Sequence, residues 1–226
     1  MKIVLGGTEL TKLYFIRHGK TEWNLESRYQ GAGGDSPLLS QSYDEMNQLA
    51  QHIKTVKFSH IYASPIKRAR LTAVTIARQL KRRPPISLLS RLEEFNLGKM
   101  EGMKFDDVKR LYPEEFDNFR NHPDLYQSKV IGGESYSDVI NRMTPAVLSI
   151  VQNNPDDNVM VVSHGAALNA EMNHLLGTPL ADLRKRGGLA NTSTTILEST
   201  DGKTFKLLKW NDTSYLNRKL DKTDLV

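Results

Sequence analysis

Four short apolar or β-branched runs, separated by segments of helical period, constrain the fold of this chain more than any other feature. The runs cover residues 12–17, 59–63, 158–163 and 193–198, and each has the length and composition of a strand. Strands that alternate with helices are typical of an α/β domain. The sequence therefore predicts an α/β fold of three layers, in which a mostly parallel central sheet carries helices on both faces.

Capping residues and prolines predict where several helices begin and where one is disturbed. Ser40, Ser64 and Ser135 each precede a helical pattern, and Pro65 would occupy the first helical position after Ser64. Pro145 lies inside the last of these patterns and predicts a kink or a break just before it.

The length of 226 residues fits a single domain that spans residues 1–226. Within it, the region 98–134 is interrupted by several glycines and prolines and is the least regular part of the sequence. We expect this region to be a lid-like excursion over the sheet.

Composition excludes several classes of protein. With no cysteine, the chain has neither disulfides nor thiolate chemistry, and no stretch approaches the roughly 20 apolar residues that cross a bilayer. The first residues also lack the pattern of a signal peptide. We expect a cytoplasmic protein that does not bind a membrane.

The net charge of +5 raises the question of a nucleic-acid partner. The densest basic stretch, "KRARLTAVTIARQLKRRPP", has its apolar residues at helical spacing, so most of its charges lie on one solvated helix face. Because no DNA- or RNA-reading motif accompanies the charge, we expect no nucleic-acid partner.

Polar residues that suit phosphate chemistry follow three of the predicted strands. The first strand ends in Arg17-His18-Gly19, the second in "ASPIKRAR", and the third in Ser163-His164-Gly165. In an α/β sheet, ligands bind beyond the carboxyl ends of the strands. A histidine at a strand end is often structural, but two His-Gly pairs at two strand ends favour a site, since glycine lets a ligand approach the backbone.

Arg68 falls in the first turn of the helix that follows Ser64, where the helix dipole disfavours a cation. A bound anion would remove this penalty, and the N–H groups of the helix start would help to bind it. Arg17, Arg68 and the imidazoles of His18 and His164 therefore predict a site that binds a phosphoryl group without a metal. His52, His60, His122 and His174 lack such neighbours and are predicted to be surface or packing residues.

Five motifs in register resemble the histidine phosphatase superfamily, the phosphoglycerate mutase-like enzymes. They are "LYFIRHGKTEWN", "SPIKRARLTA", "RLEEFNLGKMEG", "GGES" and "VVSHGAAL", and the resemblance spans about residues 12–198. The resemblance implies the phosphoglycerate mutase-like fold, a nucleophilic His18 that is phosphorylated during turnover, and a glutamate that donates the leaving-group proton. It also implies that the phosphate is held by Arg17, Arg68 and His164, with Asn24, Gln30, Gly31 and Gly165 around it.

The "LEEFNLG" segment offers two adjacent glutamates, Glu93 and Glu94, which cannot both point into one pocket. The register of the family motif favours Glu94 as the acid. The same segment resembles phosphatase-type members more closely than the dedicated mutases, which carry "LNERHYG" there. We therefore expect a phosphatase that acts on a small phosphorylated metabolite, with a phosphoglycerate mutase as the alternative.

Three other functions are alternatives to a histidine phosphatase. A metal-dependent hydrolase could in principle use His18, His164 and Asp35, but the H-x-H, H-E-x-x-H and D-x-D patterns are absent. A nucleotide switch or kinase is disfavoured because "GAGGDSP" matches no phosphate-binding loop. An inactive phosphate-binding module of the same fold is the non-enzyme alternative. We expect no cofactor and no metal, and the sequence leaves a homodimer open.

Two departures from the family pattern leave the substrate undetermined. Where phosphatase-type members resemble "QGWxDSPL", this chain reads "QGAGGDSPL", and Met100 replaces a usual tryptophan. Both changes are expected at the mouth of the pocket. Sugar phosphates, nucleotides and phosphorylated acids all remain open as substrates.

Overall fold

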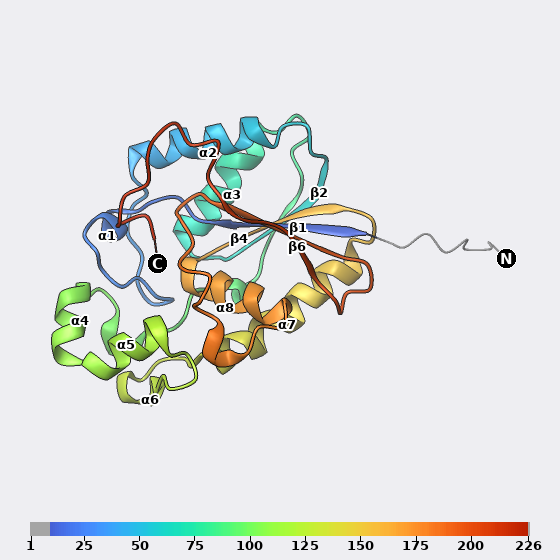
Figure 1. The fold of residues 1–226 in the computed structure, drawn as a ribbon. Coiled ribbons are helices and arrows are strands. Elements are labelled where there is room, and N and C mark those ends of the chain that lie inside the picture. Colours follow the sequence, from blue (N-terminus) through green and yellow to red (C-terminus); the bar gives the residue numbers. More distant parts are fainter. Residues whose placement is uncertain (1–9, 226) are drawn as a thin grey trace.

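In the computed structural model, which describes residues 10–225, a six-stranded sheet forms the centre of the molecule (Figure 1). Its order is β3-β2-β4-β1-β5-β6. The first four strands in this order are parallel, and β5 and β6 are antiparallel to their neighbours. The strands are β1 (Thr11–Arg17), β2 (Phe58–Ala63), β3 (Ile86–Leu88), β4 (Asn158–Ser163), β5 (Thr194–Ser199) and β6 (Lys206–Asp212).

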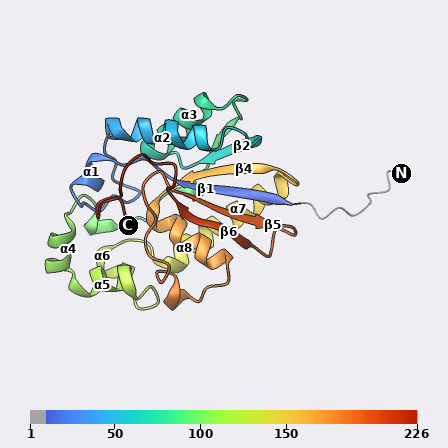
Figure 2. The same ribbon diagram turned by 45° about the horizontal axis from the view of Figure 1, so that its top comes forward.

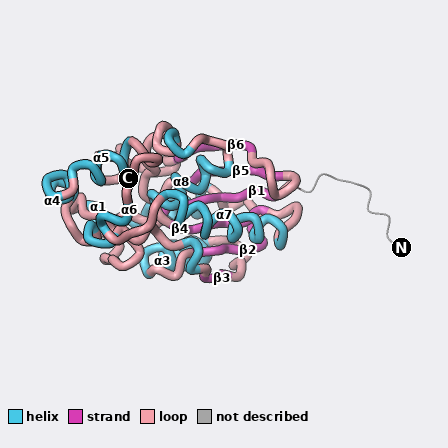
Figure 3. Tube along the Cα trace, turned by 90° about the horizontal axis from the view of Figure 1, so that it is seen from below, coloured by secondary structure: helices cyan, strands magenta, loops and turns pink. Residues whose placement is uncertain are grey.

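Helices cover both faces of this sheet, which confirms the predicted three-layer α/β fold. In Figure 1, α2 and α3 lie above the sheet and α7 and α8 lie below it; Figure 3 views the molecule from the side of α7 and α8. The helices are α1 (Glu22–Leu25), α2 (Ser40–His52), α3 (Lys67–Gln79), α4 (Phe105–Leu111), α5 (Pro113–Asn121), α6 (Ser128–Ile131), α7 (Tyr136–Asn153) and α8 (Gly165–Leu175), with 3-10 turns η1 (Ser90–Leu92), η2 (Gly98–Met100) and η3 (Leu180–Asp182). No helix within residues 10–225 is long and apolar enough to span a bilayer.

Alternating side chains of the central strands build two separate cores. In β1, Leu13 and Phe15 join the core that includes α7 and α8, whereas Tyr14 and Ile16 join the core under α2 and α3. Successive residues of a strand point to opposite faces, so a strand covered on both sides is apolar throughout. This explains why β1 and β4 stand out in the sequence as continuous apolar runs.

The four predicted strands are confirmed, but β3 and β6 were not predicted. β3 has only three residues, and the side chains of β6 are exposed or half-buried, so neither has a strong apolar pattern. Ser135 caps α7 as predicted, with a capping box to Asp138. The predicted start of α3 at Pro65 is wrong, because residues 64–66 form a turn and the helix begins at Lys67.

Two other expectations about local structure need correction. α7 runs unbroken from Tyr136 to Asn153 through Pro145, so the predicted break is wrong, while a kink before Pro145 stays a prediction. The long buried face of α7 offsets the hydrogen bond that proline cannot make. The region 98–134, predicted as least regular, contains α4, α5 and α6. These helices are short, and α4 and α6 lack side-chain caps, which is why the sequence did not reveal them.

The carboxyl ends of the parallel strands meet at one end of the sheet, where several segments distant in sequence gather. Figure 2 shows α1, the α4–α6 group and the C-terminal residues at this end. This end is therefore where the residues that follow β1, β2 and β4 can meet.

Candidate active site

The two histidines of the sequence motifs are brought together by adjacent parallel strands. Arg17 of β1 pairs with Ser163 of β4, so His18 and His164 leave the sheet side by side. Their rings lie with centroids 5.2 Å apart at an angle of 61°. Both imidazoles are buried. The predicted convergence of these residues is confirmed by the sheet topology.

The hydrogen bonds of His18 fix which ring nitrogen carries the proton. Nδ1 lies 2.7 Å from the carbonyl oxygen of Gly19, and only a protonated Nδ1 can bond there. Nε2 lies 3.2 Å from Nε of Arg68, whose N–H donates to it. Nε2 therefore carries a lone pair, which is the form of a histidine nucleophile.

The charge state of His18 agrees with this geometry. Burial, followed by the positive charges of Arg68 and Arg17, lowers the pKa of His18 well below its ordinary value of 6.5. Burial and nearby cations, Arg68 first, likewise lower the pKa of His164. Both imidazoles are thus neutral at neutral pH in this structure.

Gly19 is required by the close packing of this loop against α2. A Cβ atom at Gly19 would lie 2.7 Å from Cε of Met46 and 2.9 Å from Cβ of Ser42. Any larger residue would force the loop or the α2 side chains to shift. The glycine of the Arg17-His18-Gly19 motif therefore keeps the nucleophile in position.

Arg68 lies in the first turn of α3 as predicted, but its donors are already engaged. Besides the bond to His18, its Nη atoms donate to the carbonyl oxygens of Gln30, Gly31 and Gly34 at 2.7–3.3 Å and to Oδ1 of Asp35 at 3.3 Å. The glycine-rich loop 30–35 thus wraps the guanidinium. A phosphoryl group can bind Arg68 only by sharing or displacing these acceptors.

Arg17 is buried without a carboxylate in direct contact. Its Nη1 donates to the carbonyl oxygens of Leu189 and Asp224, both at 2.6 Å. Burial lowers the pKa of Arg17 to about 10, so it remains a cation at neutral pH. Nε is buried and has no partner among residues 10–225. A phosphoryl oxygen would satisfy this N–H.

Glu94, and not Glu93, lines the pocket. Its carboxylate accepts the backbone N–H groups of Ala166 at 3.0 Å and Ala167 at 2.7 Å, at the start of α8. A third N–H, from Phe95, donates to the same carboxylate at 3.0 Å. The position of the side chain therefore agrees with the predicted register of the "LEEFNLG" segment.

Ser64 is a site residue that the sequence predicted only as a helix cap. Its Oγ lies 2.8 Å from Nε2 of His164 and accepts the backbone N–H of Ile66. Nδ1 of His164 is buried and has no partner within the described chain. The position of Ser64 directly after β2 is the sequence signal that could have identified it.

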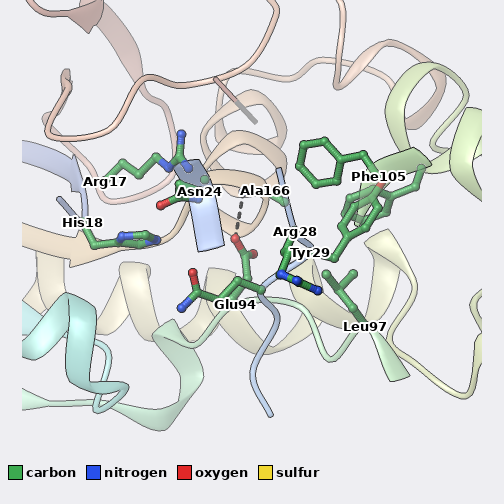
Figure 4. A pocket seen from close by; sticks show the side chains of 12 residues that line it. Arg17, His18, Asn24, Arg28, Tyr29, Glu94, Leu97, Phe105 and Ala166 are labelled. Atoms are coloured by element: carbon green, nitrogen blue, oxygen red, sulfur yellow. Dashed lines mark hydrogen bonds between the residues drawn. The ribbon is translucent and has the colours of Figure 1, made fainter. Parts of the chain in front are cut away.

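A narrow pocket, with a volume of about 30 Å³, joins Arg17, His18 and Glu94 to an aromatic wall (Figure 4). Arg68 and His164 do not line this pocket, although both lie next to His18. Asn24, Gln30 and Gly165 line the pocket as predicted, whereas Gly31 contributes its carbonyl oxygen to Arg68 instead. The lining residues are Arg17, His18, Asn24, Arg28, Tyr29, Gln30, Glu94, Leu97, Phe105, Phe119, Gly165 and Ala166.

The other candidate residues also lie outside the pocket. Asp35 binds Arg68 instead of joining the two histidines, and residues 10–225 contain no group of three or more acidic or histidine side chains that could hold a metal. His52, His60, His122 and His174 do not line the pocket. Met100, expected at the pocket mouth, is fully buried in the core with Leu92 and Phe95, so that expectation is wrong.

The lowered pKa values of the two buried histidines predict a loss of stability in acid. The unfolded imidazoles take up protons near pH 6.5, while the folded ones stay neutral to a much lower pH, so stability falls as pH drops below 6.5. Each histidine should cost about 1.4 kcal/mol of unfolding free energy between pH 7.5 and 5.5.

Urea unfolding at the two pH values checks this expectation in the wild type, His164→Asn and His122→Asn. The His164→Asn variant should lose about 1.4 kcal/mol less than the wild type on acidification. His122 is exposed, so its variant should behave like the wild type. An equal acid loss in all three proteins would contradict a neutral His164 in the folded enzyme.

Comparisons with known proteins agree with the geometry of the site. Residues 13–213 match the model of the histidine phosphatase superfamily (branch 1). The chain is 33% identical over 172 residues to the Escherichia fergusonii protein named Probable phosphoglycerate mutase GpmB, covering 75% of this chain and 77% of that one. It is 30% identical over 207 residues to Phosphoserine phosphatase 1 of Hydrogenobacter thermophilus, covering 92% and 95%.

A solved structure shares the fold over most of both chains. Bacillus stearothermophilus YhfR superposes with a TM-score of 0.84 at 36% sequence identity, over 91% of this chain and 98% of that one. The family match extends over well more than half of the sequence and includes both histidine motifs. The chain is therefore a phosphoryl-transfer enzyme that belongs to the histidine phosphatase superfamily.

Proposed function

We propose that this enzyme hydrolyses the phosphate monoester of a small metabolite through a phosphohistidine at His18. The observation that supports the proposal best is the Nε2 lone pair of His18, held beside two buried arginines. A neutral imidazole can attack phosphorus, and the arginines offset the negative charge that would otherwise repel it. No metal is required in this scheme.

The proposed reaction has two chemical steps. In the first, Nε2 of His18 forms a bond to phosphorus, the bond to the ester oxygen breaks, and the Glu94 carboxyl gives that oxygen a proton. In the second, water attacks phosphorus, the bond to Nε2 breaks, and the Glu94 carboxylate takes the proton of the water. Nε of Arg17 and Nδ1 of His164 are buried without a partner among residues 10–225, and in this scheme both donate to phosphoryl oxygens in the two steps.

Hydrolysis is favoured over transfer to a second hydroxyl. The relative named as a phosphoserine phosphatase aligns over 92% of this chain, whereas the relatives named as mutases align over 75%. Retention of a nucleophile, an acid and unpaired phosphate donors supports an active enzyme over an inactive binding module.

The pocket wall supports a substrate whose organic part is partly apolar. Tyr29, Leu97 and Phe105 form this wall opposite His18, and Arg28 lies beside them (Figure 4). Phe119 also lines the pocket. A small phosphorylated metabolite of this kind fits a cytoplasmic enzyme, and the proposal includes neither a nucleic-acid nor a membrane partner. A homodimer and the lid role of the α4–α6 region remain predictions.

Hydrolysis without a metal is the outcome that separates the proposal from its alternatives. A panel of phosphate monoesters, assayed in EDTA with and without bisphosphoglycerate, should release inorganic phosphate at rates that neither addition changes. Vanadate should inhibit, since it can adopt the geometry of the phosphoryl transition state. Isomerisation of phosphoglycerate that depends on bisphosphoglycerate would indicate a mutase, and activity that EDTA abolishes and a metal restores would refute the scheme.

The two histidines should respond differently to substitution. His18→Ala should abolish labelling of the enzyme by a phosphate donor, because the nucleophile is lost. His164→Ala should slow labelling by about 100-fold or more and leave the label on His18. Mass spectrometry of acid-labile phosphopeptides locates the label, and a phosphate on His164 would reverse the assignment.

The role of Glu94 should depend on the leaving group. Glu94→Gln should reduce hydrolysis of an alkyl phosphate by about 100-fold or more, because an alkoxide needs a proton to leave. It should spare much of the rate with p-nitrophenyl phosphate, whose phenolate needs little help. Glu93→Gln is the matched control and should change both rates slightly and equally. The leaving-group effect in Glu93→Gln instead would place the acid one residue earlier.

A further inference from the structure

Beyond the proposed hydrolysis, on which this inference rests, we infer that Asp224 is a positioning residue for Arg17 and thereby sets the affinity of the enzyme for the phosphoryl group. Asp224 belongs to residues 213–225, which follow β6 and return to the carboxyl end of β1 (Figure 1). We call these residues the C-terminal strap. No part of the strap lines the pocket, so its effect must pass through Arg17.

The strap supplies one of the two backbone carbonyl oxygens that orient Arg17. Nη1 of Arg17 donates to the carbonyl oxygen of Asp224 at 2.6 Å. The same carbonyl accepts the backbone N–H of Asn191 at 3.1 Å, and Nδ2 of Asn191 donates to the carbonyl oxygen of His18 at 3.2 Å. The carbonyl group of Asp224 therefore contacts Arg17 directly and is linked to the backbone of His18 through Asn191.

The carboxylate of Asp224 holds that carbonyl in place. It is fully buried and accepts two hydrogen bonds from Arg218, both at 2.7 Å, and one from the backbone N–H of Asp221 at 2.7 Å. Nζ of Lys20 lies 3.1 Å away. Burial alone would raise the pKa of Asp224, but the bonds from Arg218, Asp221 and Lys20 outweigh it and lower the pKa, so the carboxylate is charged.

The strap is also attached to the body of the protein away from the site. Nε of Arg218 donates to Oε1 of Glu45 in α2 at 2.6 Å. Arg218 thus joins Asp224 to a helix of the α2–α3 layer. Because the phosphate-facing N–H of Arg17 must be held at a fixed position to bind tightly, loosening either end of this bridge should weaken phosphate binding before it unfolds the protein.

The substitution Asp224→Asn tests the inference, with Asp221→Asn as the matched control. Asp221 also pairs with Lys20, at 3.1 Å, but its side chain is 57% exposed and does not touch Arg17. Asp224→Asn should raise the dissociation constant of inorganic phosphate, measured by calorimetry, and the KM for p-nitrophenyl phosphate, each by about tenfold. Asp221→Asn should change both by less than about twofold.

The amplitude of the phosphoenzyme burst separates positioning from simple damage to the fold. In the Asp224→Asn variant the burst amplitude should stay close to one phosphoryl group per chain, because the variant is folded and only binds phosphate more weakly. Arg218→Gln, a substitution at a partly exposed residue, should raise the same two constants in the same direction and thus provides a second test.

Two results would overturn the inference. One is an unchanged phosphate affinity and KM in both variants; the other is a burst amplitude that falls in proportion to activity. Calorimetry of phosphate does not depend on turnover, so it tests the strap even if the wild type forms no phosphohistidine. If the wild type forms no phosphohistidine, the proposed hydrolysis mechanism is refuted, and the inference about Asp224 is still decided by the phosphate affinities.

Discussion

The site depends on one pair of hydrogen bonds, those that hold the ring of His18 between the Gly19 carbonyl oxygen and Nε of Arg68. The Gly19 carbonyl oxygen accepts a hydrogen bond from Nδ1, and the Arg68 N–H donates one to Nε2. Only the neutral tautomer with its proton on Nδ1 and its lone pair on Nε2 can make both bonds. The strand pairing of β1 with β4, the tight contact of Gly19 with α2 and the start of α3 all serve to place these three groups. The fold therefore selects the reactive form of the side chain before any substrate binds.

A second constraint follows from burying cations next to that imidazole. Arg17, Lys20 and Arg68 are all buried, and a buried charge is costly unless it is hydrogen-bonded or paired. The chain meets this cost mainly with backbone carbonyl groups, which orient Arg17 and Arg68. Arg17 has no carboxylate in direct contact, whereas Arg68 also pairs with Asp35 at 3.3 Å. Lys20, which faces the strap, is paired instead with Asp221 and Asp224. The charge of Arg17, which lines the pocket, is thus left without a paired carboxylate, whereas that of Lys20, which does not line it, is neutralised.

Much of this arrangement could be predicted from the sequence, because it depends on local patterns. The apolar runs that became β1 and β4 end directly in the His-Gly pairs, so parallel pairing places His18 and His164 together. The register of the family motif favoured Glu94 over Glu93 as the acid, and Glu94 is the one that lines the pocket. What could not be predicted depends on contacts between distant segments. The carbonyl oxygens of Leu189 and Asp224 on Arg17, and those of loop 30–35 on Arg68, carry no side-chain signal, since every residue has a carbonyl. Met100 was misplaced for the same reason, because burial depends on the α4–α6 region that packs around it.

The protonation of His18 in the resting enzyme is the property on which the proposed chemistry depends most, and ¹⁵N NMR of histidine-labelled protein measures it directly. We predict that His18 shows a protonated Nδ1 and an unprotonated Nε2, and that this pattern persists from pH 8 to below pH 6 because burial and the two arginines lower its pKa. A proton on Nε2, or a doubly protonated ring at pH 6.5, would contradict a nucleophilic His18 held ready by the fold.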